Sequence, residues 1–495
     1  MEETKTLGLK DVISVSVGLV VATSCLVSLG QGAGEIGTMF IVSMVIACLF
    51  NMITLASISE LNALMPNTTG GLAQYTLAAV GPVPTIVLMV GGYLLSNILS
   101  SGVEASIFSY AMGEIIPLHI NNFFYSAIIT VLLMVLNLRG VDMFAKLQDA
   151  TAYLLLGSML IMGIIGAVKG GTGAVVNQPA YYNVSFKNVT AMTATAFWLF
   201  IGAEYAIPIS KNVKNAKKNV PLGMFIGLGI LCFVQSMMVL GFHNYTSWND
   251  LMNSPAPHML YGYALLGKPG RYWMAGVAAL ALISTQNSTV QGLSSICQGM
   301  AIMDMLPHVF ARTNKKNVPW FGVVFVSALI LLFAYISNDS SDAISFLILV
   351  GSVFWMFSYI FAHIDVLVFR KRFPKAPRSF KVPGGIVLPI LGIIGTSYMI
   401  LNISTDPVER NKIWMITGIT FAVLFLYAVL WIKFKMKIPV WKSIPIHKVL
   451  AMESPMYYYV RHRKIIPSQG SSVPVSKKSE ESTLPSTTSG SSEEE

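Results

Sequence analysis

Long apolar runs follow one another along most of the chain and are separated by short polar or basic stretches. Most runs have about 20 residues, the number that a helix needs to cross the hydrocarbon core of a bilayer. Glycine and proline are frequent inside them, which transmembrane helices tolerate when neighbours or cavity water satisfy the freed backbone. The pattern predicts an all-α integral membrane protein with twelve spans, at residues 11–31, 38–64, 83–111, 122–138, 150–168, 189–209, 221–242, 271–298, 319–337, 343–369, 385–404 and 411–433.

The composition agrees with a membrane protein. Of the 495 residues, 54% are hydrophobic and only 11% are charged, whereas soluble domains carry about 25% charged residues. The four cysteines lie apart in apolar segments, and no side chains have the spacing of a metal site, a catalytic triad or a phosphate loop. We therefore expect no metal, no cofactor and no enzymatic activity.

The basic residues of the loops indicate the orientation. With an even number of spans, both termini lie on one side, and the loops of that side carry 17 Lys and Arg against six on the other. By the positive-inside rule both termini are cytoplasmic, in a multi-pass protein of the plasma membrane. The net charge of +10 then reflects topology and contact with anionic lipid, so we expect no nucleic-acid partner.

The character of the chain changes after residue 433. A basic stretch, KFKMK, leads to an end that is rich in serine and glutamate and has almost no large apolar side chains, a composition typical of disorder. We expect a transmembrane domain at 1–433 and a cytoplasmic tail at 434–495, largely disordered at its end. The tail is either regulatory or a solvated tail without a specific partner.

Span six contains an unusual stretch, FWLFIGAEYAIP, with Gly202, Glu204 and Pro208 close together. Glycine makes unwinding cheap and proline removes a backbone donor. An interrupted helix exposes carbonyl and amide groups, which suit the ammonium and the carboxylate of one small molecule. A charged side chain in a span usually faces a cavity or a partner, and Glu104 in span three is a second such acid. The alternative is a kinked helix with a protonated structural glutamate.

Span one has a matching feature. A small and partly polar patch is followed by glycines at 30, 32, 34 and 37, which indicates either a second break or close helix packing. Interruptions in spans one and six, five apart, are the sign of an inverted five-plus-five repeat with its site at the membrane midplane, here followed by two C-terminal helices. The patch consists of Ala22, Thr23, Ser24 and Cys25.

Polar side chains also occur in spans three and eight. In span three Asn97, Ser101, Glu104 and Phe108 fall on one helix face. In span eight the stretch ISTQNSTVQ, at 283–291, holds seven polar residues, which need either a wet cavity or interhelical partners. Trp198, four residues before the predicted break, has either a packing role or a gating and cation–π role.

Five stretches of the chain resemble the amino acid–polyamine–organocation superfamily of permeases, in the expected order over about residues 10–433. They are SELNALMPNTTGGLAQY after span two, NLRGVDMFAKLQD between spans four and five, FIGAEYAIPISKNVKNAKKNVP in and after span six, MLPHVFARTNKKNVP after span eight and FRKRFPKAPRSFKVPGG after span ten.

Span six is most similar to that of the bacterial arginine/agmatine antiporter within this superfamily. The resemblance implies that Trp198 contacts substrate, that the carbonyl of Ile201 receives the substrate amine and that Glu204 takes part in pH-dependent transport. Asn97 matches a span-three asparagine of that antiporter.

The chain also departs from the family. Ala22-Thr23-Ser24-Cys25-Leu26 replaces the glycine-rich motif of span one, Thr289 takes the place of a span-eight tryptophan, and Leu155 replaces a lysine tied to proton coupling in some members.

These features together predict a secondary active transporter for an amino acid or related amine, working by alternating access. The ammonium is expected at the carbonyls near Ile201 and Gly202 and the carboxylate at the span-one amides, with Trp198 closing from outside. Glu204 and Glu104 are candidates for proton coupling or gating, and protons are a candidate coupling ion. Leu155 favours exchange. No oligomeric state is predicted.

A nutrient sensor is the alternative. It would have the same fold and would signal through the tail with little flux. Deleting residues 434–495 distinguishes the two, because only a sensor would lose its output.

Overall fold

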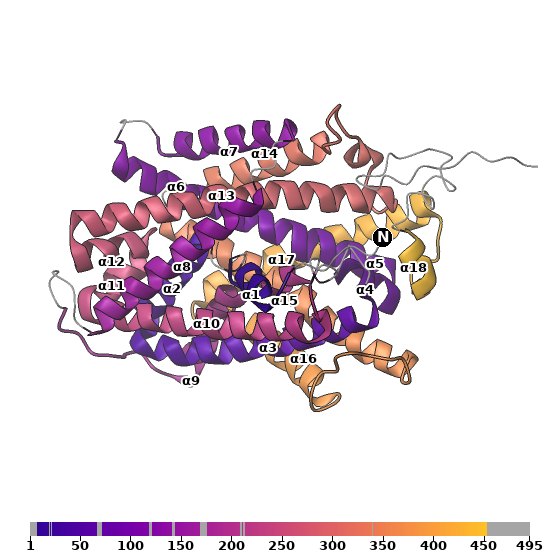
Figure 1. The fold of residues 1–495 in the computed structure, drawn as a ribbon, viewed down its shortest axis with the longest axis horizontal. Helices are drawn as coiled ribbons and strands as arrows, with labels where there is room; N and C mark the ends of the chain where they lie inside the picture. The colour runs from indigo at the N-terminus through magenta and orange to yellow at the C-terminus, as the bar shows by residue number, and fades with distance from the viewer. Residues whose placement is uncertain are drawn as a thin grey trace, which may run out of the picture.

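The structure is a computed structural model that describes residues 7–18, 20, 22–66, 72–117, 121–140, 144–168, 176–207, 210, 213–338 and 340–452. Within these ranges the regular structure is helical, apart from one isolated parallel bridge between Leu7 and Val213. The helices form one elongated bundle (Figure 1). The predicted all-α class is therefore confirmed for the described part of the chain.

The α-helices have the bounds α1 Leu9–Gly18, α2 Thr23–Ile36, α3 Phe40–Leu64, α4 Leu72–Ala79, α5 Pro82–Val87, α6 Ser96–Ile115, α7 Phe123–Leu138, α8 Phe144–Val168, α9 Phe186–Phe197, α10 Ala216–Tyr245, α11 Trp248–Asn253, α12 Pro257–Leu266, α13 Lys268–Ile302, α14 Trp320–Ile336, α15 Ser341–Arg372, α16 Val387–Leu401, α17 Pro407–Trp431 and α18 Ile446–Met452. The shorter turns are the 3₁₀ segments η1 Gly37–Met39, η3 Trp198–Phe200, η4 Ala203–Ala206 and η6 His308–Ala311, and the π segments η2 Leu88–Leu95 and η7 Ile432–Met436.

The apolar runs of the sequence coincide with these helices. Five helical runs are long and apolar enough to cross a bilayer, at Thr23–Leu64, Pro82–Ile115, Ala216–Tyr245, Ser341–Arg372 and Pro407–Met436, and four shorter apolar helices accompany them, at Phe123–Leu138, Tyr153–Val168, Trp320–Ile336 and Val387–Leu401. Spans one and six each fall on more than one helical segment, as their polar insertions predict.

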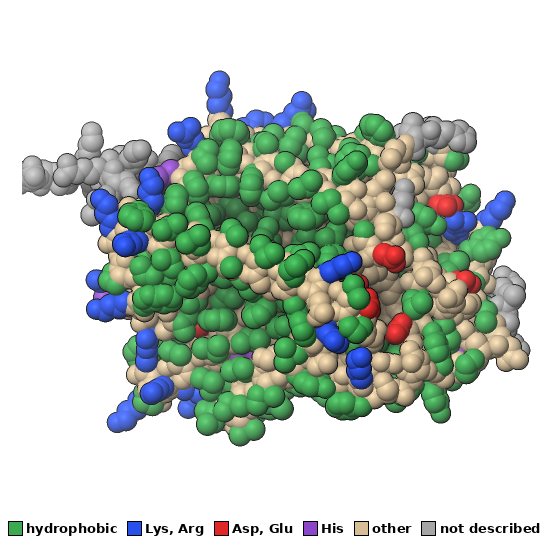
Figure 2. Space-filling model, turned by 180° about the vertical axis from the view of Figure 1, so that it is seen from behind, with side chains coloured by type: hydrophobic (Ala, Val, Ile, Leu, Met, Phe, Trp, Pro, Cys, Tyr) green, Lys and Arg blue, Asp and Glu red, His purple; other side chains and the backbone are tan. Residues whose placement is uncertain are grey.

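The surface of the bundle carries many apolar side chains, and its basic and acidic side chains lie toward different ends. Large apolar side chains such as Ile128, Phe233 and Ile419 are more than half exposed, which suits lipid contact. Lys and Arg gather at the end of the bundle where α4 and α18 lie, and most visible Asp and Glu lie toward the other end (Figure 2). This separation follows the loop charges that the positive-inside rule uses.

The segment after η7 packs back onto the bundle. The backbone amide of Ile444 donates to the carbonyl of Leu77 at 3.5 Å, and the guanidinium of Arg372 donates to the Ser443 hydroxyl at 2.8 Å. Figure 1 places α18 beside α4. The first part of the predicted tail is thus docked, whereas residues 453–495, with the stretch predicted to be disordered, lie outside the described residues.

Candidate functional site

The helix of span six is interrupted at the predicted place. Helix α9 passes into the 3₁₀ turn η3, Ile201 then has an extended backbone (φ −75°, ψ 138°), and Gly202 has a φ of 111°. A β-carbon would be strained at that positive φ, so glycine is required here. The interruption removes the regular amide donors of the preceding carbonyls. Pro208, the third member of the predicted break, lies outside the described residues.

Span one is also interrupted. Helix α1 ends at Gly18 and α2 begins at Thr23, after Ala22 with an extended backbone (φ −107°, ψ 161°). The first amides of a helix have no intrahelical acceptor and lie at the positive end of its dipole. The backbone at the start of α2 is therefore suited to an anionic group such as a carboxylate.

The two breaks face each other. The indole Nε1 of Trp198 donates to the Ser24 hydroxyl at 3.3 Å, and the Cys25 thiol lies 3.9 Å from the carbonyl of Trp198. Ser24 and Cys25 open α2, whereas Trp198 opens the 3₁₀ turn before the break of span six. The carbonyls of one break and the amides of the other thus approach the same space.

A cavity of about 250 Å³ occupies this space. Its volume suits a small molecule. Eight of the ten residues that the sequence singles out line it: Ala22, Ser24, Cys25, Asn97, Glu104, Trp198, Ile201 and Gly202. The other two, Thr23 and Glu204, are not among the residues that line it.

Glu104 is held by hydroxyl groups from three helices. Oε1 accepts from Ser24 of α2 at 3.2 Å and from Ser100 of α6 at 3.1 Å, and Oε2 accepts from Thr285 of α13 at 2.7 Å. The side chain is only 3% exposed, at the cavity wall. The acid therefore joins the start of α2 to α6 and α13. A ligand that displaces one of these hydroxyls would alter the link among the three helices.

Glu204 points to its own backbone instead of the cavity. Oε2 accepts from the amide of Gly202 at 3.1 Å, and Oε1 accepts from the indole of Trp355 at 3.2 Å. The carboxyl group thus caps the break and ties it to α15. Gly202 and Trp355 both line the cavity. Glu204 is therefore connected to the cavity wall through these two hydrogen bonds.

An aromatic wall was not found by sequence reasoning. Tyr93, Tyr205 and Trp355 all line the cavity; the rings of Tyr93 and Trp355 are 5.1 Å apart, and the Tyr205 hydroxyl donates to Asn97 at 3.1 Å. Tyr93 belongs to the π segment η2, a local form that is frequent at functional sites. The available signal in the sequence was the glycine pair Gly91-Gly92, which indicates close helix packing. A β-carbon at Gly92 would lie 2.0 Å from the Ser358 hydroxyl oxygen.

The polar stretch of span eight has both roles that the sequence allowed. Thr285, Ser288 and Thr289 line the cavity. On another face of α13, Gln286 donates to Thr130 at 2.7 Å, and Asn287 accepts from a side chain of the same helix, α7, at 2.7 Å. One face of the stretch is therefore part of the cavity, and the other holds two helices together.

The glycines of span one have a packing role beyond the break. A β-carbon at Gly30 would lie 2.3 Å from the ring of Pro257, and one at Gly34 would lie 2.7 Å from the amide nitrogen of Met252. These glycines let α2 approach α12 and α11 closely. The two interpretations of the span-one pattern thus apply to successive parts of the same segment.

A helical bundle with two facing broken helices and a small polar and aromatic cavity between them is typical of secondary transporters. A family model described as "Amino acid permease" matches residues 7–446, nearly all of the described bundle. The chain therefore belongs to the amino acid permease family and is a transporter, in agreement with the resemblance seen in its loop motifs.

Known proteins give the same result. The branched-chain amino acid permease BcaP of Bacillus subtilis is 22% identical over 453 residues, which cover 86% of this chain and 93% of that protein. A putative arginine/ornithine antiporter of the same organism is 24% identical over 240 residues, 47% of this chain and 50% of that protein. The structure of a manganese transporter from Eremococcus coleocola aligns with a TM-score of 0.55 at 14% identity, covering 85% and 94% of the two chains; this likeness concerns the fold alone.

Proposed function

We propose that this permease moves an amino acid or a related amine across the plasma membrane by alternating access, with substrate bound between the two breaks. The proposed architecture has twelve spans in a five-plus-five inverted repeat with two further helices, both termini cytoplasmic, and residues 434–495 as the tail. The observation that carries the proposal is the cavity of about 250 Å³ that lies between the start of α2 and the break at Ile201–Gly202.

The ammonium and carboxylate groups of an amino acid fit this arrangement in one orientation. The ammonium lies at the carbonyls next to Ile201, where the chain is extended, and the carboxylate lies at the amides of Ala22 to Cys25, where α2 begins. Asn97 and the aromatic wall beside it line the space left for the substrate side chain.

Trp198 is proposed as the outer gate. Its indole closes one side of the cavity and is held by Ser24. On the other side the lining continues along α13 through Gly292 to Ile296, toward the end of the bundle where α4 and α18 lie. In the proposed orientation this end is the cytoplasmic one, and the site would open toward it.

Glu204 and Glu104 are proposed as the groups that couple the gate to protons. Glu204 links the break to Trp355, and Glu104 links α2 to α13. A change of protonation at either acid exchanges an acceptor for a donor and alters contacts between moving elements. Leu155 of α8, where some relatives have a lysine, favours exchange over proton symport.

Reconstitution tests the function. The purified protein in liposomes is screened with the amino acids and their decarboxylated amines by thermal stabilisation, and the best ligand is taken into counterflow. We expect counterflow in the wild type and loss of its pH dependence in Glu204→Gln. Binding without counterflow would contradict transport and return the sensor alternative, for which the transporter relatives give no support.

A cavity-filling pair supplies the control. Ser288→Trp places a large ring in the cavity and should abolish binding and counterflow. Ser295→Trp makes the same change on the same helix at an exposed position and should leave both intact. Equal effects of the two substitutions would contradict this location of the site.

A further inference from the structure

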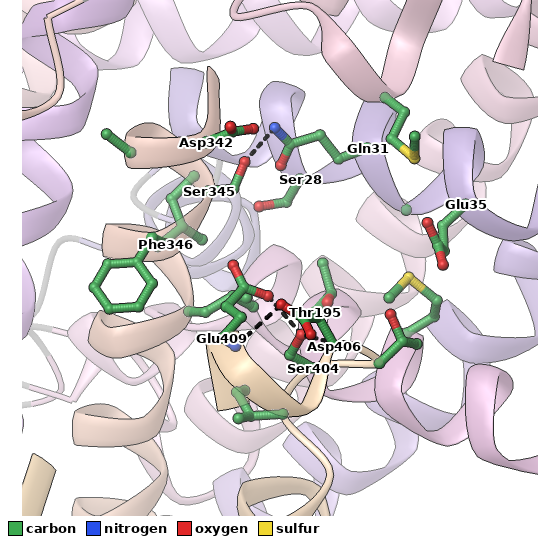
Figure 3. A pocket seen from close by; sticks show the side chains of 18 of the residues that line it. Ser28, Gln31, Glu35, Thr195, Asp342, Ser345, Phe346, Ser404, Asp406 and Glu409 are labelled. Atoms are coloured by element: carbon green, nitrogen blue, oxygen red, sulfur yellow. Dashed lines mark hydrogen bonds between the residues drawn. The ribbon is translucent and has the colours of Figure 1, made fainter. Parts of the chain in front are cut away.

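A second and larger cavity opens on the other side of Trp198. It has a volume of about 750 Å³ and lies between α2, α9, α15 and the start of α17 (Figure 3). Ser28 of its wall is one helical turn beyond Ser24, and Thr195 is one turn before Trp198. We call this cavity the outer vestibule. A ligand that leaves it for the central cavity has to pass Trp198.

The outer vestibule is acidic. Its lining contains four carboxylates and one lysine, namely Glu35, Asp342, Asp406, Glu409 and Lys412. The carboxylates come from three helices, and those of Asp406, Asp342 and Glu35 all repel the charge of Glu409. A concave surface with such an excess of negative charge raises the local concentration of cations.

Helix capping explains part of this charge. Asp406 is the N-cap of α17 and accepts from the amides of Val408 and Glu409 at 3.0 and 3.1 Å. Asp342 and Glu409 lie in first turns, where an acid is favourable. Glu35 has no such explanation, because it lies in the last turn of α2, where the helix dipole disfavours a negative charge. Its position therefore indicates an interaction with a ligand in the vestibule.

Ser28 supplies an independent sign of a ligand. Its side chain is only 1% exposed, and among the described residues its hydroxyl has no hydrogen-bond partner. It points into the vestibule in Figure 3, on the same helix face as Gln31 and Glu35, at spacings of three and four residues. A buried hydroxyl without a partner is costly, so a donor arriving in the vestibule would satisfy it.

The arrangement suits an organic ammonium group better than a metal ion. Among the described residues no three carboxylate, histidine or cysteine side chains converge closely enough to hold a metal. One oxygen of Glu409 already accepts from Ser404 at 2.5 Å, and Gln31 is bonded to Ser345 at 2.5 Å. What remains is a wide acidic surface with one buried acceptor, which matches a bulky cation that carries N–H donors.

We propose that the outer vestibule is a second binding subsite, in which the acidic surface of Glu35 and Asp342 attracts the ammonium group of the substrate and Ser28 accepts a hydrogen bond from it before it passes Trp198. The inference rests on the proposed transport function and adds a second binding site to the path of the substrate. Trp198, which borders the central cavity, then lies ahead of the cation, and an indole ring there favours the passage of a cation by cation–π attraction.

Labelling of Thr405→Cys, at a half-buried position of the vestibule wall, tests the charge preference without any transport. Two methanethiosulfonate reagents of similar size, one with a trimethylammonium and one with a sulfonate, are applied to the protein in liposomes, and the rate of the parent protein is subtracted. We expect the cationic reagent to react at least about tenfold faster than the anionic one, relative to their rates with a free thiol. The combined Glu35→Gln and Asp342→Asn substitutions should bring this ratio close to one.

Asp250→Asn is the matched control, because Asp250 is an exposed acid of α11 outside the vestibule lining. It should leave the labelling ratio unchanged. A ratio near one in the unsubstituted vestibule, or a ratio that survives the double substitution, would overturn the subsite. Neither outcome depends on counterflow, so failure of this inference is separable from failure of the proposed function.

Protection identifies the occupant. The amine or amino acid that gives counterflow should slow labelling of Thr405→Cys severalfold at saturation, and the double substitution should abolish this protection. Equal protection by sodium chloride, compared with choline chloride at the same ionic strength, would overturn the ammonium assignment in favour of an inorganic cation. In flux assays the double variant should show a KM raised about threefold or more with kcat unchanged, an effect that disappears at high salt.

Discussion

Replacing Glu204 by alanine should destabilise the break of span six. The substitution removes the acceptor of two donors, the amide of Gly202 and the indole of Trp355, at 3.1 and 3.2 Å. A buried donor left without a partner costs about 1 to 3 kcal/mol, so the two together cost about 2 to 6 kcal/mol. Because both residues line the cavity, water satisfies part of the loss, and we expect the lower end, about 2 kcal/mol.

Glu204→Gln should cost less. Its amide oxygen replaces one acceptor, but its NH₂ group meets the second donor and cannot accept from it. One donor then loses its partner, at a cost of about 1 to 2 kcal/mol. The order of stability is therefore wild type, then glutamine, then alanine.

Inactivation half-life in detergent at a fixed temperature measures this order. A loss of about 2 kcal/mol shortens the half-life by up to about 30-fold if it acts wholly on unfolding. Trp355→Phe removes only the second donor, so a double-mutant cycle with Glu204→Ala isolates that bond and should give a coupling of about 0.5 to 3 kcal/mol.

Glu114→Ala supplies the comparison. Glu114 pairs with Arg271 at 2.5 Å, but both side chains are about one-third exposed, and such pairs contribute at most about 1 kcal/mol. If Glu204→Ala inactivates no faster than Glu114→Ala, or if the cycle shows no coupling, the capping role derived for Glu204 is refuted.

Three further outcomes are expected. Glu60→Gln should destabilise the protein by about 3 to 5 kcal/mol, because Glu60 is 2% exposed and pairs with two arginines; a wild-type inactivation rate would contradict this. Gly30→Ala should lower thermal stability by about 1 to 3 kcal/mol, since its β-carbon would lie 2.3 Å from Pro257, whereas Gly229→Ala, with nothing within 4 Å, should not. Removing residues 453–495 should leave counterflow unchanged; loss of flux would assign the tail a direct role.

The positions of the helices and the break of span six were predictable from the sequence because each has a local cause. Apolar runs of membrane length become helices irrespective of their neighbours. Gly202 with a φ of 111° marks a backbone form that few other residues adopt. Glu204 was recognised as unusual for the same local reason, since a carboxyl within a span requires a partner.

The aromatic wall and the partners of the acids depend on tertiary arrangement and could not be predicted. Tyr93, Tyr205 and Trp355 stand in apolar stretches, where an aromatic side chain is equally suited to packing against lipid or against another helix. The bond from Trp355 to Glu204 joins residues 151 positions apart. Span eight shows the same limit, because its periodicity alone does not distinguish the face of Thr285 from that of Gln286.

The most direct test of the account is a structure, by electron cryomicroscopy or crystallography, of the protein with the ligand that gives counterflow. The account predicts density in the cavity of about 250 Å³, with the ammonium within hydrogen-bonding distance of the Ile201 carbonyl and, for an amino acid, the carboxylate at the first amides of α2. Ligand density elsewhere, with the central cavity empty at a saturating concentration, would contradict the claim that the two breaks form the substrate site.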